Sequence, residues 1–200
     1  MATYTPRDRF YRKARERGLP SRAAFKLEEL IGRFRLVKAG ARIADLGCAP
    51  GGWLAILARA AGPDGVVVGI DVAQCKSPAP GVVTLVGDVS DTATAGLVLA
   101  ELGGRADLVT SDLSPKLTGI AARDQVRARA LAEAALEFAE RCLKPGGAMV
   151  AKLFMGADFA GVMGGFKRRF GKVDVTRTRA TRPGSSELYV VARDFKPSAL

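Results

Sequence analysis

The sequence contains no histidine among its 200 residues. A chain without histidine cannot carry a Ser-His-Asp or Cys-His nucleophile system, an H-E-x-x-H metallohydrolase motif or the histidine-ligated zinc of the nucleobase deaminases. Proton transfer would have to use lysine, aspartate, glutamate, tyrosine or cysteine instead. Several large enzyme classes are therefore excluded before any motif is considered.

Cysteine and long apolar runs are also scarce. Cys48, Cys75 and Cys142 are odd in number, widely spaced and without C-x-x-C pairing, so we expect small core residues rather than a disulfide framework or a zinc site. No apolar run approaches the ~20 residues of a membrane span. The arginine-rich N-terminus lacks the apolar centre of a signal peptide. The sequence thus predicts a cytoplasmic protein with no metal site and no membrane partner.

Positive charge is what the sequence has in excess. Its 31 lysines and arginines outnumber 20 aspartates and glutamates, which gives a net charge of +11 and a pI near 10.1. This balance favours a polyanionic partner, and nucleic acid above others. The basic residues gather in an N-terminal arm, residues 1–20, with Tyr4, Phe10 and Tyr11 interleaved, and again at residues 167–169. The arm could bind phosphates and stack on bases, or it could be a solvated tail.

Residues 21–200 are expected to form a single domain, because 48% hydrophobic residues supply a sizeable core and no linker or repeat interrupts the chain. Ser21 is predicted to cap the first helix of this domain. The core-facing stripe of that helix consists of Leu27, Leu30, Ile31 and Phe34. Lys26 lies at the border of the stripe, where a lysine can either extend to solvent or reach into a cleft.

The stretch 41–61 organises the rest of the chain. Residues 41–46 predict a buried strand, 47–52 a turn almost without side chains, and 53–61 a helix of strong helix formers. Glycines in such a turn let the backbone approach a ligand, and the helix N-terminus directs free N–H groups at it. The glycines are not in the register of a dinucleotide site or a P-loop. The pattern Asp-x-Gly-x-x-Pro-Gly-Gly resembles instead the cofactor loop of S-adenosylmethionine-dependent methyltransferases.

Four consecutive predicted strands end in an acid. The acids are Asp45, Asp71, Asp88 and Asp112. Ligands of an open parallel sheet lie at the carboxyl ends of its strands, so we expect all four carboxylates to meet there. Asp71, which follows the glycine turn by the spacing typical of a βαβ nucleotide site, is expected to bind a pair of ribose hydroxyls.

The second half of the chain alternates helices with strands. The predicted helices span residues 91–102, 124–143 and 159–170, and Asp91 is the expected cap of the first. The strand at 148–154 carries Lys152 in its middle. A lysine in a buried run is costly unless it is paired, so Lys152 is either on a solvent face or functional, and function is favoured.

The last two predicted strands, residues 172–180 and 187–194, are joined by a turn at 182–184 and must therefore be antiparallel. The order of elements predicts one α/β domain.

Five motifs follow one another along the chain. They are Ser-Arg-Ala-Ala-Phe-Lys (21–26), Asp-Leu-Gly-Cys-Ala-Pro-Gly-Gly-Trp (45–53), Ser-Asp-Leu-Ser-Pro (111–115), Ala-Lys-Leu-Phe (151–154) and Ser-Ser-Glu-Leu-Tyr (185–189). In this combination they resemble the FtsJ/RrmJ (RlmE) family of ribosomal RNA 2′-O-ribose methyltransferases, over roughly residues 7–194.

The resemblance implies a Rossmann-like class I S-adenosylmethionine-dependent methyltransferase fold, with a seven-stranded, mostly parallel sheet, one antiparallel strand and helices on both faces. It implies a catalytic tetrad of Lys26, Asp112, Lys152 and Glu187. It places the contacts with S-adenosyl-L-methionine at Gly51, Trp53, Asp71, Asp88 and Asp112. The implied substrate is a uridine ribose 2′-hydroxyl of 23S ribosomal RNA in the large ribosomal subunit, and the implied enzyme is a monomer.

The tetrad has a chemical rationale. A neutral lysine amine can accept the proton of the ribose hydroxyl when burial and a neighbouring cation lower its pKa. Lys152 beside Lys26 would supply that neighbour, while Asp112 and Glu187 would orient the two amines. Positioning of the hydroxyl is expected to be the larger contribution to the rate.

The cofactor contacts also have distinct expected roles. Asp71 would bind the cofactor ribose, Asp88 its adenine amino group, and the Trp53 side chain would line the pocket. One departure from the family pattern is the sequence at 114–117, Ser-Pro-Lys-Leu, where many bacterial members have Ala-Pro-Asn-Met. This departure leaves the substrate contacts near Lys116 open.

Three other functions stay open at this point. A 2′-O-methyltransferase of tRNA or of an mRNA cap would use a related tetrad, although no cap-binding insertion is evident. A catalytically silent RNA-binding assembly factor would keep the fold, but the intact tetrad argues against it. A dinucleotide oxidoreductase is disfavoured because the glycine register is wrong.

Overall fold

The computed structural model describes residues 9–19, 21–116, 118–156, 158–182 and 184–197. Its helices are α1 (Arg9–Glu16), α2 (Ala24–Phe34), α3 (Gly52–Ala61), α4 (Thr92–Leu102), α5 (Ala121–Cys142) and α6 (Phe159–Arg169). Its strands are β1 (Arg42–Leu46), β2 (Val66–Asp71), β3 (Val82–Val86), β4 (Ala106–Ser111), β5 (Leu143–Phe154), β6 (Phe170–Thr176) and β7 (Glu187–Phe195). None of the helices in these ranges is both long and apolar enough to cross a membrane.

The strands form one seven-stranded sheet in the order β3-β2-β1-β4-β5-β7-β6. Strands β1 to β5 pair in parallel, whereas β7 runs antiparallel to both β5 and β6. The predicted mostly parallel sheet with one antiparallel strand is therefore confirmed. The strand order reverses between β1 and β4, and in sheets of this kind ligands bind outside the carboxyl ends of the strands at such a reversal.

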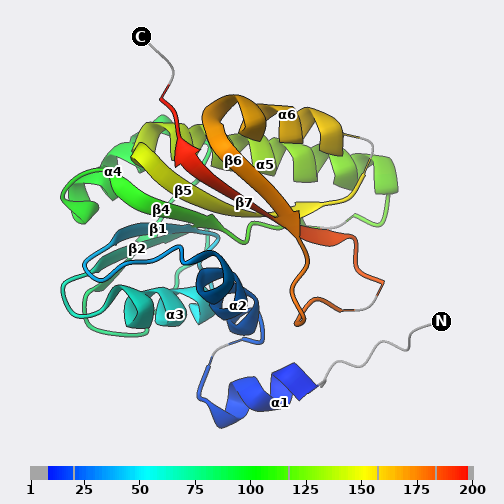
Figure 1. Cartoon of the computed structure of the whole chain (residues 1–200). Helices are drawn as coiled ribbons and strands as arrows, with labels where there is room; N and C mark the ends of the chain where they lie inside the picture. The colour runs from blue at the N-terminus through cyan, green and yellow to red at the C-terminus, as the bar shows by residue number, and fades with distance from the viewer. Residues whose placement is uncertain (1–8, 20, 117, 157, 183, 198–200) are drawn as a thin grey trace.

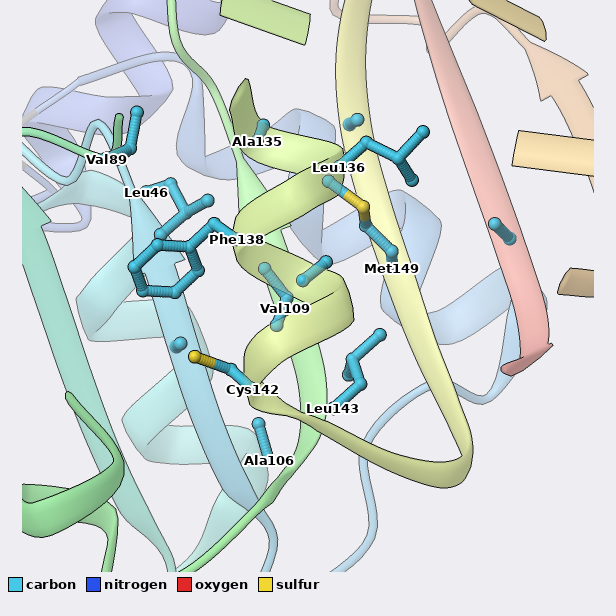
Figure 2. Packing of buried hydrophobic residues seen from close by; sticks show 14 of the residues in the cluster. Leu46, Val89, Ala106, Val109, Ala135, Leu136, Phe138, Cys142, Leu143 and Met149 are labelled. Atoms are coloured by element: carbon cyan, nitrogen blue, oxygen red, sulfur yellow. The ribbon is translucent and has the colours of Figure 1, made fainter. Parts of the chain in front are cut away.

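Helices cover both faces of the sheet (Figure 1). One buried cluster packs α4, α5 and α6 against the sheet, and a second packs α2 and α3 against the opposite face. In the first cluster, Phe138 of α5 points toward Leu46 of β1, and Cys142 lies one turn further along the helix (Figure 2). Because both faces are covered, the central strands are apolar almost throughout, as is typical of parallel sheets.

Several predicted element ends are confirmed. Asp91 caps α4 by accepting a hydrogen bond from the Ala93 N–H at 2.9 Å. Gly103 ends the same helix in the left-handed conformation that favours glycine. The predicted helix at 124–143 and strand at 148–154 are not separated by a loop in the structure, because α5 ends at Cys142. Instead β5 begins at Leu143, and the register with β4 shifts between Ala106 and Leu108, so the extra residues are accommodated as a bulge.

The prediction that Ser21 caps the first helix of the domain is wrong. Helix α2 begins at Ala24 after Ala23, and no side chain caps it. The Ser21 hydroxyl lies instead against α3, so close that a Cβ atom on Gly52 would be 2.7 Å from Ser21 Oγ. The Ser21 side chain, which the local sequence favoured as a helix cap, is thus used in the packing against α3 instead.

The N-terminal arm contains a helix that the sequence did not predict. Residues 1–8 and residue 20, including Tyr4 and the start of the basic run, lie outside the described residues. Residues 9–16 form α1, whose Ala14 is buried in a small cluster with Phe25 of α2 and Ala180. The Phe10 and Phe25 rings are 5.8 Å apart, and Arg17 pairs with Glu28 at 3.2 Å. The described part of the arm is therefore docked on α2.

Candidate active site

The loop between β1 and α3 is shaped by glycines. Gly47 has φ +75°, and a Cβ atom there would lie 3.0 Å from Leu113 Cδ2. Gly51 has φ +101° and is the N-cap residue of α3. The backbone N–H groups of Gly47 and Cys48 both donate to the Ile70 carbonyl of β2. A side chain at Gly47 or Gly51 would be strained at these φ values, so both positions favour glycine. Without side chains there, a ligand can approach the backbone of the loop closely.

A cavity of about 320 Å³ opens at the carboxyl ends of β1, β2 and β4, where the strand order reverses. Its lining residues are Gly47, Ala49, Ile70, Asp71, Val72, Gly87, Asp88, Val89, Asp112, Leu113, Ser114 and Leu131. Three of the four strand-ending acids therefore meet in one cavity, as predicted. Its volume lies in the range of small-molecule sites, which is roughly 300–1,000 Å³.

Backbone hydrogen bonds hold two of these acids in place. Asp71 Oδ2 accepts from the Ala49 N–H at 3.0 Å, and Asp71 Oδ1 accepts from the Ala73 N–H at 2.9 Å. Asp88 Oδ1 accepts from the Ser90 N–H at 2.8 Å. Carboxylates fixed in this way present their remaining lone pairs to the cavity in a defined orientation.

Asp45, the fourth acid, does not reach the cavity. Its side chain is fully buried in β1 and accepts a hydrogen bond from Thr110 Oγ1 at 2.7 Å. Burial, opposed by this hydrogen bond, raises the pKa of Asp45 to about 8. The expectation that all four carboxylates meet is therefore wrong for Asp45, because β1 is flanked by β2 and β4 and continues one residue beyond it.

Trp53 is also placed differently from the expectation. Its ring is 3% exposed, its Nε1–H donates to the Ala23 carbonyl at 2.9 Å, and its centroid lies 6.1 Å from that of Tyr189. Neither Trp53 nor Gly51 is among the residues that line the cavity. The Trp53 ring packs instead near Ala23 and Tyr189, and its contact with the cofactor stays a prediction.

The apolar wall of the cavity was not predicted from the sequence. This wall includes Val72, Val89, Leu113 and Leu131. Val72 is 73% exposed although it is a large apolar residue. A sequence signal was available for Val72 and Val89, since each directly follows a strand-ending acid. Leu131 comes from α5, and only the packing of that helix brings it to the site.

The four residues of the expected tetrad form two largely buried ion pairs. Lys26 Nζ lies 2.5 Å from Glu187 Oε1, and Lys152 Nζ lies 3.1 Å from Asp112 Oδ1. Lys152 Nζ also donates to the Asp112 backbone carbonyl at 2.8 Å. The lysine side chains are only 10% and 8% exposed. Lys26 therefore reaches into the interior, and Lys152 is paired, as its place in an apolar strand requires.

Tyr189 connects the two pairs. It is fully buried and is the cross-strand partner of Lys152 in the β5–β7 ladder. Its hydroxyl donates to Asp112 Oδ1 at 3.3 Å, and Lys26 Nζ lies 5.7 Å from the centre of its ring. Burial, followed by the Asp112 and Glu187 carboxylates, raises the pKa of Tyr189, so its hydroxyl stays protonated. Tyr189 had no predicted role of its own, apart from its place in the motif at residues 185–189.

Two other features of the sequence are the segment at 114–117, which continues from the cavity, and the basic cluster at 167–169, which lies away from it. The Lys116 backbone carbonyl accepts a hydrogen bond from Arg127 of α5, while Leu117 lies outside the described residues. The basic cluster at 167–169 ends α6, which meets the start of β6 at the edge of the sheet opposite the cavity. Within the described residues, no group of three or more cysteine, aspartate or glutamate side chains could hold a metal ion.

The sheet order, the antiparallel β7 and the acid-lined cavity after a glycine loop define a Rossmann-like methyltransferase. The chain belongs to the FtsJ-like methyltransferase family, whose model matches residues 19–195.

Curated relatives agree with this assignment. One is the ribosomal RNA large subunit methyltransferase E of Syntrophobacter fumaroxidans, 41% identical over 197 residues, which cover 98% of this chain and 100% of that protein. The protein of the same name from Acidiphilium cryptum is 45% identical over 193 residues, covering 96% and 84% of the two chains.

Solved structures show the same fold. A ribosomal RNA methyltransferase from Plasmodium falciparum matches with a TM-score of 0.77 and 27% identity, covering 88% of this chain and 97% of that one. Aeropyrum pernix fibrillarin, solved with natively bound S-adenosyl-L-methionine, matches with a TM-score of 0.55 and 15% identity, covering 78% and 67%. Because the identity is only 15%, the similarity to fibrillarin shows the fold alone.

Proposed function

We propose that the protein transfers a methyl group from S-adenosylmethionine to the 2′-hydroxyl of a uridine ribose in 23S ribosomal RNA of the large subunit. The observation that carries this proposal is the pair of buried lysine–carboxylate contacts, Lys26–Glu187 and Lys152–Asp112, beside an acid-lined cavity. Asp112 pairs with Lys152 and also lines the cavity, so it joins the ion pairs to the cavity. The names of the curated relatives support the ribosomal substrate.

The cavity fits the cofactor in size and in chemistry. Asp71 is proposed to accept hydrogen bonds from the cofactor ribose, and Asp88 from the adenine amino group, because both carboxylates are fixed by backbone N–H groups at the cavity wall. Val72 and Leu131 provide apolar contact. Gly51 contributes through its left-handed backbone, which sets the path of the loop into α3.

The bound cofactor supplies a sulfonium methyl group that is already electrophilic. The residues of the chain must therefore hold the ribose hydroxyl in line and remove its proton. Lys152 is proposed to orient the hydroxyl and take up this proton, with its amine fixed by the two Asp112 oxygens. Lys26, fixed by Glu187, is proposed to hold the same ribose from the α2 side.

Substitution of Lys152 by alanine tests this mechanism. Loss of a proton acceptor should lower the single-turnover rate by ~10²–10⁴-fold at saturating cofactor, and cofactor binding should be largely unchanged. Asp112→Ala should lower the rate and also weaken cofactor binding, since Asp112 pairs with Lys152 and lines the cavity. Lys144→Ala is the matched control. Lys144 lies in the same strand, β5, but at the opposite end of the strand from Lys152, and its side chain is half exposed. Near-normal turnover by Lys152→Ala would contradict the mechanism.

The division of the chain follows from the same proposal. Residues 1–20 are proposed to contact RNA, and residues 21–200 to form the catalytic domain, which acts as a monomer. A ribosomal substrate places this activity in the cytoplasm. The exposed and basic side chains of α1, Arg9, Arg12 and Lys13, support an RNA contact beside the helix that carries Lys26.

A further inference from the structure

Two of the three cysteines lie against one another at the cofactor loop. Cys48 belongs to the loop after β1, and Cys75 to the segment that joins β2 to β3. Cys75 Sγ is 4.0 Å from the Cys48 carbonyl oxygen, so the Cys75 side chain lies directly against the Cys48 residue. Both are buried, as the sequence predicted, with exposed fractions of 3% and 8%. Nothing in the proposed reaction uses either thiol.

The pair joins two walls of the cofactor cavity. Cys48 lies between Gly47 and Ala49, which both line the cavity, and the Ala49 N–H donates to Asp71. Cys75 lies a few residues beyond Asp71, and its carbonyl accepts a hydrogen bond from Thr84 Oγ1 at 2.9 Å. A bond between the two sulfur atoms would therefore link the glycine loop to the segment that follows Asp71.

We propose that Cys48 and Cys75 are a redox modification site, at which a small-molecule disulfide produces an intramolecular Cys48–Cys75 disulfide that weakens cofactor binding. In the first step the Cys75 thiolate attacks the reagent disulfide and releases one small thiol. In the second step the Cys48 thiolate attacks the Cys75 sulfur of the mixed disulfide and releases the other small thiol. Two protein thiols are oxidised, one reagent disulfide is reduced to two thiols, and both protons remain with the products.

The order of attack follows from burial. Cys75 lies in an irregular segment, and its neighbours Gln74, Lys76 and Ser77 are exposed. Cys48 is packed under β2, so that a Cβ atom on Gly69 would lie 2.9 Å from Cys48 Sγ. Burial raises the pKa of the Cys48 thiol, which makes it a poor first nucleophile. Cys75 therefore meets the reagent first, and Cys48 resolves the mixed disulfide.

The loop has little room to absorb a new bond. Because both cysteines are free thiols, a disulfide must draw their sulfur atoms to about 2.05 Å, much closer than two unbonded sulfur atoms can lie. Gly47 already lies against Leu113, and Asp71 is fixed by two backbone N–H groups. The displacement must therefore reach residues that line the cavity. This expected effect on cofactor binding rests on the proposed function, whereas formation of the disulfide does not.

The experiment compares the full chain with two single variants, Cys75→Ala and Cys142→Ala. Cys142 is the matched control, because it is fully buried in the α5 cluster, its pKa is raised by burial to about 12, and Figure 2 shows it among apolar side chains. Each protein is incubated with oxidised glutathione, mapped by peptide mass spectrometry, and titrated with S-adenosylmethionine by calorimetry before and after addition of dithiothreitol.

We expect a Cys48–Cys75 crosslink in the wild type and in Cys142→Ala, with cofactor affinity at least tenfold weaker and restored by dithiothreitol. Cys75→Ala should keep its affinity throughout. Absence of the crosslink, or modification of Cys142 alone, would overturn the site. A crosslink with unchanged affinity would overturn its effect on the cofactor. Failure of every reduced protein to bind the cofactor would count against the proposed function instead, since the crosslink is read independently.

Discussion

Tyr189 illustrates how one buried side chain can organise a charged site. Its ring lies near both the Trp53 ring and the Lys26 amine, while its hydroxyl reaches Asp112. A phenol that stays protonated can only donate to a carboxylate here, so it adds a fixed hydrogen bond without adding charge. Tyr189 is therefore a positioning residue, which acts on the reaction through Asp112 and Lys152.

Tyr189→Phe should separate the hydroxyl from the ring. The ring contacts with Trp53 and Lys26 remain, but Asp112 loses one donor, so we expect the single-turnover rate to fall about tenfold, in keeping with one hydrogen bond to a charged group. The pH at which the rate is half-maximal should also move, because the Asp112 carboxylate that pairs with Lys152 loses a hydrogen bond that stabilises its charged form. A rate and pH profile equal to those of the wild type would show that Tyr189 only fills space.

Asp45 gives a prediction for stability against pH. Its folded pKa of about 8 lies far above the ordinary aspartate value of 3.8. Between these values the folded state holds a proton that the unfolded state has lost, so the free energy of unfolding must fall as the pH rises. From pH 5 to pH 8 this one group could remove up to about 4 kcal/mol.

Asp45→Asn isolates the effect, because the amide keeps the shape and stays neutral at every pH. Urea unfolding at pH 5 and pH 8 should show a loss of stability in the wild type that is smaller in the variant. Other titrating groups cancel in this comparison, since they are common to both proteins. Equal pH dependence in the two proteins would mean that Asp45 is ionised in the folded state.

At the scale of elements, local sequence predicted the elements that build the cavity. Strands that end in an acid converge because parallel strands place their carboxyl ends at one edge, which explains why Asp71, Asp88 and Asp112 meet. Helix α1 could not be predicted in this way. It has one buried residue, Ala14, and its partner Ala180 is far along the chain, so no apolar period marks it. Long-range docking, rather than local pattern, makes it a helix.

The charge on α1 can be tested without removing the helix. Arg12 and Lys13 are exposed, so Arg12→Gln with Lys13→Gln should leave its docking through Ala14 intact. We expect weaker RNA binding and a shallower dependence of log affinity on log salt, by up to ~0.7–0.9 per lost phosphate contact.

The matched control is Lys38→Gln with Lys196→Gln. It changes the charge equally, and both residues are exposed at the edge of the sheet opposite the cavity, before β1 and after β7. Equal salt slopes for the two double variants would mean that α1 contributes only through the net charge of the molecule.

At the scale of the whole molecule, the described residues form one sheet with its helices, and the proposed function requires them both to catalyse and to recognise RNA. The family match, residues 19–195, covers nearly all of the described chain, and α1 is the element that precedes it among the described residues. The strong net charge of +11 supplies attraction to RNA of any sequence, because phosphate contacts carry no sequence information. Selection of one ribose must therefore depend on how the substrate presents it.

We therefore expect the substrate to be a folded ribosomal particle rather than free RNA. A particle can fix the shape and exposure of a single nucleotide, which protein-free RNA cannot do equally well. Large subunits that lack the modification should be methylated much faster than the same RNA stripped of protein, in assays with radiolabelled cofactor followed by mass-spectrometric mapping of ribose methylation. Lys152→Ala serves as the blank, because it should keep the fold and lose the transfer. Efficient and site-selective methylation of protein-free RNA, of tRNA or of capped mRNA would contradict the particle substrate while leaving the methyltransferase chemistry intact.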